Sequence, residues 1–182
     1  SGSIWKQMTF FAMPIFLGNL FQQLYNTVDS LIVGNFLGSS ALAAVSSSGS
    51  LIFMLIGFLS GISAGAGVIV ARFFGAGDEK NLQRAVHTTV AFGLVAGVLM
   101  TGVGVALSPQ ILRWMDTPES VMRESVTYLQ IYFAGSLGFV MYNVLVGILQ
   151  AVGDSRHPLY YLIVSSVINL VLDLLFITGF HT

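Results

Sequence analysis

The stretch SLIVGNFLGSSALAAVSSSGSLIFMLIGFLSGISAGAGVIVA, residues 30–71, contains no charged side chain. As one helix, at about 1.5 Å per residue, it would be roughly 60 Å long, twice the ~30 Å hydrocarbon core of a bilayer. The run must therefore fold back, and its Gly- and Ser-rich part, residues 34–50, is where we expect the turn. This stretch predicts the end of one membrane span and the whole of the next.

The whole chain has the composition of a membrane protein. Of its 182 residues, 55% are hydrophobic and 8% are charged, and its mean hydropathy is +0.84. A soluble domain carries about 25% charged residues. The net charge of −1 and the lack of a basic stripe argue against a nucleic-acid partner. The chain has no cysteine, which excludes disulfides and thiolate metal sites.

Long apolar runs between the charged residues predict an all-α membrane protein with five transmembrane helices. Helices are favoured over strands because the runs are continuous and do not alternate. Residues 108–125 are amphipathic and are predicted to form a short interfacial helix on the outer surface. Residues 1–3 lack an initiator Met and are interpreted as a cloning scar, and residues 4–182 as a single helical bundle. The predicted helices are residues 7–37, 49–73, 84–107, 125–152 and 158–180.

The basic residues predict how these spans cross the cell membrane. Cytoplasmic loops carry an excess of Lys and Arg, and five such residues fall on one side against two on the other. This places the N-terminus in the cytoplasm and the C-terminus outside, with the first, third and fifth spans running outward in parallel. The larger group is Lys6, Arg72, Lys80, Arg84 and Arg156, and the smaller is Arg113 and Arg123.

Two of the predicted helices carry a polar stripe along one face. In each stripe the polar residues recur at intervals of three or four, which places them on one side of the helix. Each stripe contains a carboxylate, Asp29 in the first helix and Asp173 in the fifth, and no other acidic residue falls inside a predicted span. The remaining members are Asn19, Gln22 and Asn26 in the first helix, and Ser166 and Asn169 in the fifth.

The two carboxylates suggest a cation site. Each costs roughly 2.5–3.5 kcal/mol at a helix centre. Asp29 is eight residues before Leu37 and Asp173 is seven before Phe180, so both fall at a similar depth and could face one cavity. Such a pair could hold a proton or bind a cation. The alternative is that each Asp is structural and bonds to a neighbouring helix.

Other motifs carry weaker signals. The tetrapeptide GAGD, residues 75–78, matches the GxGD signature of intramembrane aspartyl proteases, but Asp78 is expected in a charged cytoplasmic loop. No nucleotide-binding or hydrolase motif is present, and we predict that the chain is not an enzyme. Pro14 is either a first-turn proline without a role or a hinge. Tyr142 shares a face with Tyr128 and Tyr132, as core packing or as cavity lining.

Four segments together resemble the N-terminal half of the multidrug and toxic compound extrusion (MATE) family, in the branch named for DNA-damage-inducible proteins. That family contains cation-coupled antiporters that export organic, often cationic, compounds. The resemblance implies twelve helices in two six-helix lobes, which open a central cleft alternately to either side. The four segments are VDSLIVGNFLGSSALAAVS (28–46), ARFFGAGD (71–78), GILQAVGDSRHP (147–158) and NLVLDLLFI (169–177).

The resemblance also implies roles for individual residues. It makes Asp29 and Asp173 the site of a proton or Na⁺, with no other cofactor or metal, and it makes Pro14 the hinge of the first helix. Gln22 and Asn169 match further positions of the coupling site. The residues assigned to the substrate cavity are Asn26, Asn143 and Tyr142.

The chain departs from the family in length, because the sixth helix and the C-lobe are absent. We therefore expect a fragment of a longer transporter, or a naturally short half that pairs with a second copy. The expected function is cation-coupled multidrug efflux, and the alternative is a non-transporting or cation-conducting membrane module or assembly subunit. The expected partners are membrane lipid, small organic substrates, and the missing lobe or a second copy.

Overall fold

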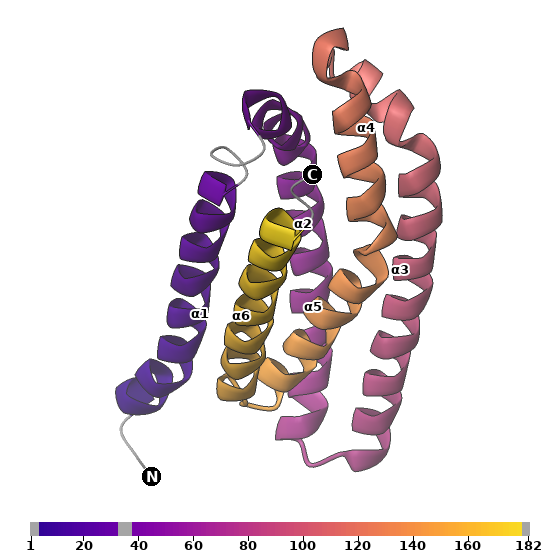
Figure 1. Cartoon of the computed structure of the whole chain (residues 1–182). Coiled ribbons are helices and arrows are strands. Elements are labelled where there is room, and N and C mark those ends of the chain that lie inside the picture. Colours follow the sequence, from indigo (N-terminus) through magenta and orange to yellow (C-terminus); the bar gives the residue numbers. More distant parts are fainter. Residues whose placement is uncertain (1–3, 33–37, 180–182) are drawn as a thin grey trace. The chain divides into compact units, whose positions relative to one another are not determined.

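The structure is a computed structural model that describes residues 4–32 and 38–179, except for the side chains of residues 25, 29–32, 38–47, 173–174 and 176–179. Every secondary-structure element in the described residues is a helix, which confirms the predicted all-α class there (Figure 1). The helices are α1 Ile4–Ile32, α2 Gly38–Gly75, α3 Glu79–Trp114, α4 Glu119–Ala134, α5 Ser136–Ala151 and α6 Arg156–Gly179.

The prediction of a turn at residues 34–50 is wrong from Gly38 onward, because α2 begins at that residue. Residues 33–37 lie outside the described part of the chain. Glycine costs a helix only about 1 kcal/mol relative to alanine, and serine less. An unpaired backbone group inside a bilayer costs several kcal/mol, so a Gly- and Ser-rich segment still forms a helix there.

The prediction of a separate interfacial helix at residues 108–125 is also wrong. Its first part completes α3 and its last part begins α4, with a turn at residues 115–118 between them. The sequence predicted that α3 would end at Ser108–Pro109, since proline cannot donate to the carbonyl four residues earlier. That carbonyl belongs to Val105, and the Gln130 side chain of α4 donates to it at 3.4 Å. A neighbouring helix thus replaces the donor that Pro109 lacks.

The predicted fourth span is broken. α4 and α5 meet at Gly135 with a bend of 46°. By length and composition, the described residues contain two helices able to cross a membrane, or three if the bent pair counts as one. They are residues 48–75 of α2, the whole of α3, and the α4–α5 pair. The total of five spans stays a prediction.

The helices group into two compact units, and each is described by itself. Unit 1 contains α1 and α6, and unit 2 contains α2 to α5. In unit 2, α3 packs along both α4 and α5. The contact follows a stripe of small residues on one face of α3: Gly93, Gly97, Thr101, Gly104 and Ser108.

This stripe holds both sides of the break at Gly135. A Cβ at Gly97 would lie 2.6 Å from Leu137 of α5, and a Cβ at Gly104 would lie 2.1 Å from the Phe133 ring of α4. Between these contacts the hydroxyls of Thr101 and Ser136 share a hydrogen bond of 3.0 Å. Small side chains therefore let α3 approach the two segments closely, as is usual where lipid gives no hydrophobic drive to associate.

In unit 1, α1 and α6 pack side by side and run in the same direction (Figure 1). The Arg156 guanidinium, at the start of α6, lies 5.2 Å from the centre of the Phe10 ring. Further along, Gly18 of α1 is buried, and its Cβ would lie 3.6 Å from Leu162. Both contacts advance toward the C-terminal ends of the helices, so α1 and α6 are parallel, as predicted for the first and fifth spans.

Gly104→Ala should destabilise the protein by about 1–3 kcal/mol, because the added methyl group overlaps a buried aromatic ring. Gly102→Ala is the matched control, since a Cβ there would meet nothing within 4 Å. Alanine favours a helix over glycine, so this control should keep or raise the melting temperature. The measurement is thermal unfolding in detergent, and equal melting temperatures for the two variants would contradict the packing described.

Candidate functional site

The predicted coupling residues lie on α1 and α6, the two helices of unit 1. Gln22 is exposed on α1, and Asn169 is half-buried on α6. Asp29 and Asp173 belong to the same two helices, but their side chains lie outside the described residues. The structure therefore describes the framework of the predicted site, and the pairing of the two carboxylates stays a prediction.

The end of the α1 stripe bonds locally. Asn26 is exposed, and its side-chain amide donates to the Gln23 side chain at 3.5 Å. Thr27 donates its hydroxyl to the Gln23 backbone carbonyl at 2.9 Å. On α6, Ser166 of the second stripe is buried. These polar groups lie in the last described turns before Asp29 and Asp173.

Pro14 lies in the interior of α1, which begins at Ile4, so the interpretation as a first-turn proline is wrong. It is half-buried, and α1 continues beyond it to Ile32. Pro14 is four residues from Phe10 and four from Gly18, the two α1 residues that contact α6. Pro14 therefore lies between two contacts of α1 with α6, where α1 lacks one backbone hydrogen bond, and its role as a hinge stays a prediction.

The predicted cavity residues Tyr142 and Asn143 lie on α5, in unit 2. Both are half-buried. The Asn143 amide donates to the backbone carbonyl of Phe139, one turn earlier, at 2.8 Å. One amide hydrogen is therefore held by its own helix, and a role in a substrate cavity stays a prediction.

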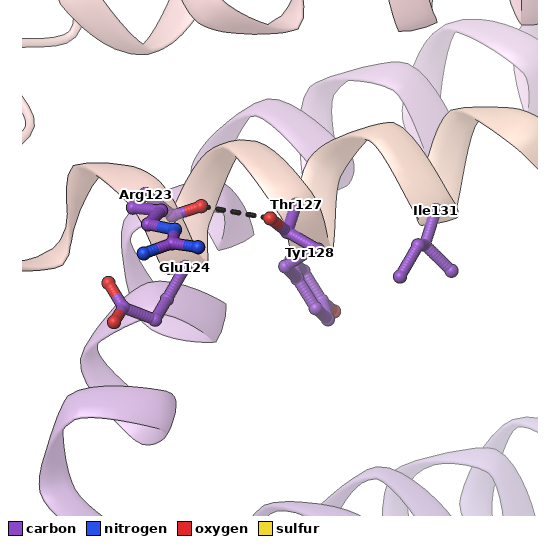
Figure 2. Close-up of a pocket in the computed structure, with 5 residues that line it drawn as sticks. All are labelled: Arg123, Glu124, Thr127, Tyr128 and Ile131. Atoms are coloured by element: carbon purple, nitrogen blue, oxygen red, sulfur yellow. Dashed lines mark hydrogen bonds between the residues drawn. The ribbon is translucent and has the colours of Figure 1, made fainter.

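A shallow pocket of about 370 Å³ follows one face of α4 (Figure 2). All its lining residues come from this single helix, and it contains none of the residues predicted to bind substrate or cation. Within the described residues there is also no cluster of three or more His, Asp or Glu side chains that could hold a metal ion. The lining residues are Arg123, Glu124, Thr127, Tyr128 and Ile131.

The GAGD motif is a helix-to-helix turn. At the end of α2 the amide of Gly77 bonds to the Phe74 carbonyl, and that of Asp78 bonds to the Phe73 carbonyl. Gly77 has a φ of 68°, the left-handed conformation that closes such an end. Asp78 then caps α3, accepting from the backbone amide of Asn81 at 3.1 Å and from its side-chain amide at 2.7 Å. The carboxylate therefore has a structural role.

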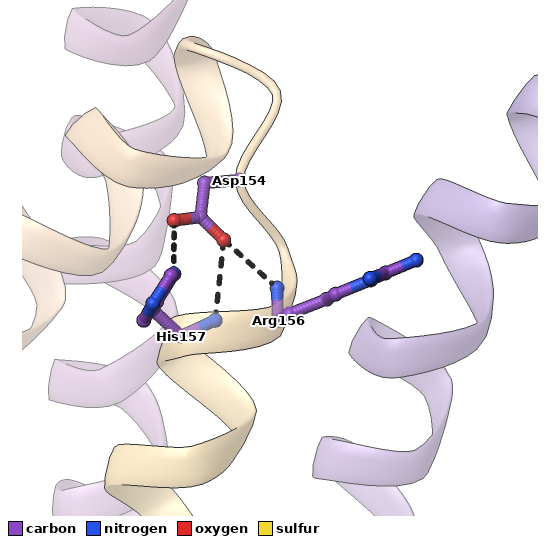
Figure 3. Close-up of polar contacts among 3 residues, drawn as sticks. All are labelled: Asp154, Arg156 and His157. Carbon is purple, nitrogen blue, oxygen red and sulfur yellow. Dashed lines mark hydrogen bonds and ion pairs between the residues drawn. The ribbon is translucent and has the colours of Figure 1, made fainter.

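Asp154 is a second helix cap, one that the sequence analysis missed. Its carboxylate accepts from the backbone amides of Arg156 and His157 at 3.1 and 3.2 Å, and it also bonds to the His157 ring (Figure 3). These interactions, led by the His157 amide, lower the pKa of Asp154. The sequence did contain a signal for this cap, because an Asp followed by a proline in the first helical turn is typical of a helix start, and Asp154 is followed by Pro158.

Residues 14–175 match the model of the MatE family. The chain belongs to the MatE family. Its relatives include probable multidrug resistance protein YoeA of Bacillus subtilis (strain 168), which is 38% identical over 97% of this chain and 38% of its own length. DNA damage-inducible protein F of Escherichia coli (strain K12) is 26% identical over 97% of this chain and 38% of its own length.

The fold agrees with solved MATE structures. A crystal structure of a MATE protein in the bent conformation superposes with a TM-score of 0.89 at 27% identity, covering 99% of this chain and 40% of the other. The chain therefore spans about two-fifths of the length of these relatives, as expected for an N-terminal half. MATE transporters are integral membrane proteins, which agrees with the apolar helices of this chain.

Asp78→Ala should lower the melting temperature, because two donors on Asn81 lose their acceptor, whereas Asp78→Asn should keep most of the cap. The hydrogen bonds from the Asn81 side chain and backbone lower the pKa of Asp78 from its ordinary value of 3.8. The stability that the charged cap contributes is therefore fully present above the pKa of the unfolded chain. It is lost as the pH falls through the lower pKa that Asp78 has in the folded protein. Thermal unfolding at pH 7 and at about pH 3 measures this, and an alanine variant as stable as wild type at pH 7 would contradict it.

Proposed function

We propose that this protein takes part in secondary active multidrug efflux, as a portion of a MATE transporter that exchanges an organic substrate for a proton or Na⁺. Its membership of a family whose relatives carry multidrug-resistance names supports the substrate class. The parallel contact between α1 and α6 supports the coupling site, because the two membrane carboxylates belong to these helices.

The contact of Gly18 with α6 supplies an approximate register, because its Cβ would lie 3.6 Å from Leu162 and 3.7 Å from Leu159. Asp29 follows Gly18 by 11 residues, and Asp173 follows Leu162 by the same number. Eleven residues are about three turns, or roughly 16 Å along a helix, and so return to nearly the same face. In two straight parallel helices this spacing puts residues 29 and 173 at a similar level along the pair. This register supports a shared site for one cation.

A shared site accounts for the cost of burying two acids. Each carboxylate costs roughly 2.5–3.5 kcal/mol at the centre of a membrane helix, and two neighbouring negative charges also repel. A proton or Na⁺ bound between them removes part of that cost. A ligand that binds one conformation better than another shifts the equilibrium toward it. The cation would thus favour one conformation and the substrate the other, which is what antiport requires.

Pro14 gives this exchange a mechanical element. It lies between the contacts of α1 with Arg156 and Leu162, where α1 lacks one backbone hydrogen bond. Bending there would move the part of α1 that carries Gln22, Asn26 and Asp29. We further propose that the N-terminus is cytoplasmic, and that the cleft is completed by a second lobe or a second copy of the chain.

Asp29→Asn and Asp173→Asn, made in the transporter that contains this chain, should each reduce cation-coupled drug efflux to background. Asp154→Asn is the matched control, because it removes a carboxylate from the α6 cap and asparagine also caps helices. The measurement is ethidium efflux from cells and substrate-driven cation flux in liposomes. Full efflux by both membrane variants would refute the coupling site, and cation flux without exchange would favour a cation-conducting module.

Pro14→Ala should slow efflux while keeping or raising the melting temperature, because alanine restores the missing hydrogen bond and stiffens α1. Ala12→Gly, two residues earlier in α1, is the control, because it changes a neighbouring residue and leaves Pro14 in place. Initial efflux rates and thermal unfolding are compared for the three proteins. Unchanged efflux by Pro14→Ala would remove Pro14 from the mechanism.

A further inference from the structure

The end of unit 1 where α1 and α6 begin carries two basic residues, Lys6 and Arg156. Arg156 is the first residue of α6, and its guanidinium lies over the Phe10 ring of α1, 5.2 Å from the ring centre. Lys6 is one helical turn before Phe10, so it is a neighbour of Phe10 on the same face of α1. Lys6 and Arg156 are both exposed. The parallel packing of the two helices therefore puts two positive charges at the same end of unit 1, with Arg156 over the Phe10 ring.

No carboxylate in the described part of unit 1 neutralises this pair. Asp154, two residues before Arg156 in the sequence, already accepts two backbone amides and bonds to the His157 ring. Figure 3 shows the Arg156 side chain extending away from the Asp154 carboxylate. Asp29 and Asp173 are more than four turns further along their helices. Two exposed like charges at one end of the unit, without a carboxylate partner among the described residues there, favour an external anion.

Exposed aromatic side chains in the first turns of α1 and α6 indicate where that anion lies. Trp5 is 80% exposed, and Tyr160 and Tyr161 of α6 are 57% and 56% exposed. In membrane proteins, exposed Trp and Tyr gather at the level of the lipid headgroups, where the ring contacts hydrocarbon and the polar group meets water. This end of unit 1 therefore has the chemistry of a headgroup interface, and the anions at that level are phospholipid phosphates.

We propose that Lys6 and Arg156 form a binding site for the headgroup of an anionic phospholipid, with the Phe10 ring beneath Arg156, at the end of unit 1 that also carries Trp5, Tyr160 and Tyr161. Arg suits a phosphate because its planar donors pair with two oxygens at once, and Lys adds a second charge. A lipid fits better than a free anion, because the exposed ring of Phe10 offers apolar surface for the start of the acyl chains. The site depends on membrane insertion and not on the proposed antiport.

The test uses the full chain in detergent, titrated with phosphatidylglycerol or with phosphatidylcholine, and native mass spectrometry measures the affinity for the first bound lipid. A basic residue near an anionic lipid surface contributes about fivefold in affinity, so wild type should prefer phosphatidylglycerol by at least that factor. Lys6→Gln/Arg156→Gln should lose the preference. Arg113→Gln/Arg123→Gln is the matched control, because it removes the same charge from the ends of α3 and α4.

The charge-preserving variant Lys6→Arg/Arg156→Lys should keep the preference, which separates a loss of charge from a loss of folding. Glycerol 3-phosphate at millimolar concentration should not displace the lipid. The proposal is overturned if wild type binds both lipids equally, if the glutamine variant keeps the preference, or if glycerol 3-phosphate competes fully, since the last result would mark a site for a soluble anion.

Discussion

Backbone hydrogen bonding is the constraint on which the rest of this structure depends. A bilayer offers no water to an unpaired amide or carbonyl, so the chain forms helix through segments that would turn in a soluble protein. α2 therefore starts at Gly38, within a Gly- and Ser-rich segment. α3 continues through Pro109 because Gln130 donates to the carbonyl that proline leaves free. In both places the penalty of an unpaired group exceeds the preference of the local sequence.

Close packing through small residues is the second constraint. Gly97 and Gly104 of α3 leave room for Leu137 and Phe133, and this one face holds both α4 and α5 across their bend. The glycine stripe of α2, at residues 57, 61 and 65, has no such neighbour within 4 Å in the described structure. Spacing alone therefore indicates a face suited to packing, and the structure decides whether another helix occupies it.

The charged residues in the turns have mostly local roles. Asp78 and Asp154 cap α3 and α6. The residues that match the GxGD signature form the turn between α2 and α3, in which Gly77 ends α2. Arg156 differs, because from the start of α6 its guanidinium reaches the Phe10 ring of α1. Asp78 and Asp154 thus cap helix starts, Lys6 and Arg156 lie at one end of unit 1, and the proposed coupling site requires the two acids within α1 and α6.

The sequence by itself determined the helical class, the resemblance to the MATE family, and the polar stripes that end near Asp29 and Asp173. The helical class and the stripes follow from composition and from spacings of three and four, which depend only on the geometry of a single helix, whereas the resemblance rests on the residues of four segments. The tertiary structure decided the break at Gly135, the continuation of α3 past Pro109, and the parallel pairing of α1 with α6. Each of these depends on a group from another helix, such as the Gln130 amide or the Leu162 side chain. Periodicity identifies the face of a helix, but its partner is chosen by packing between segments far apart in the chain.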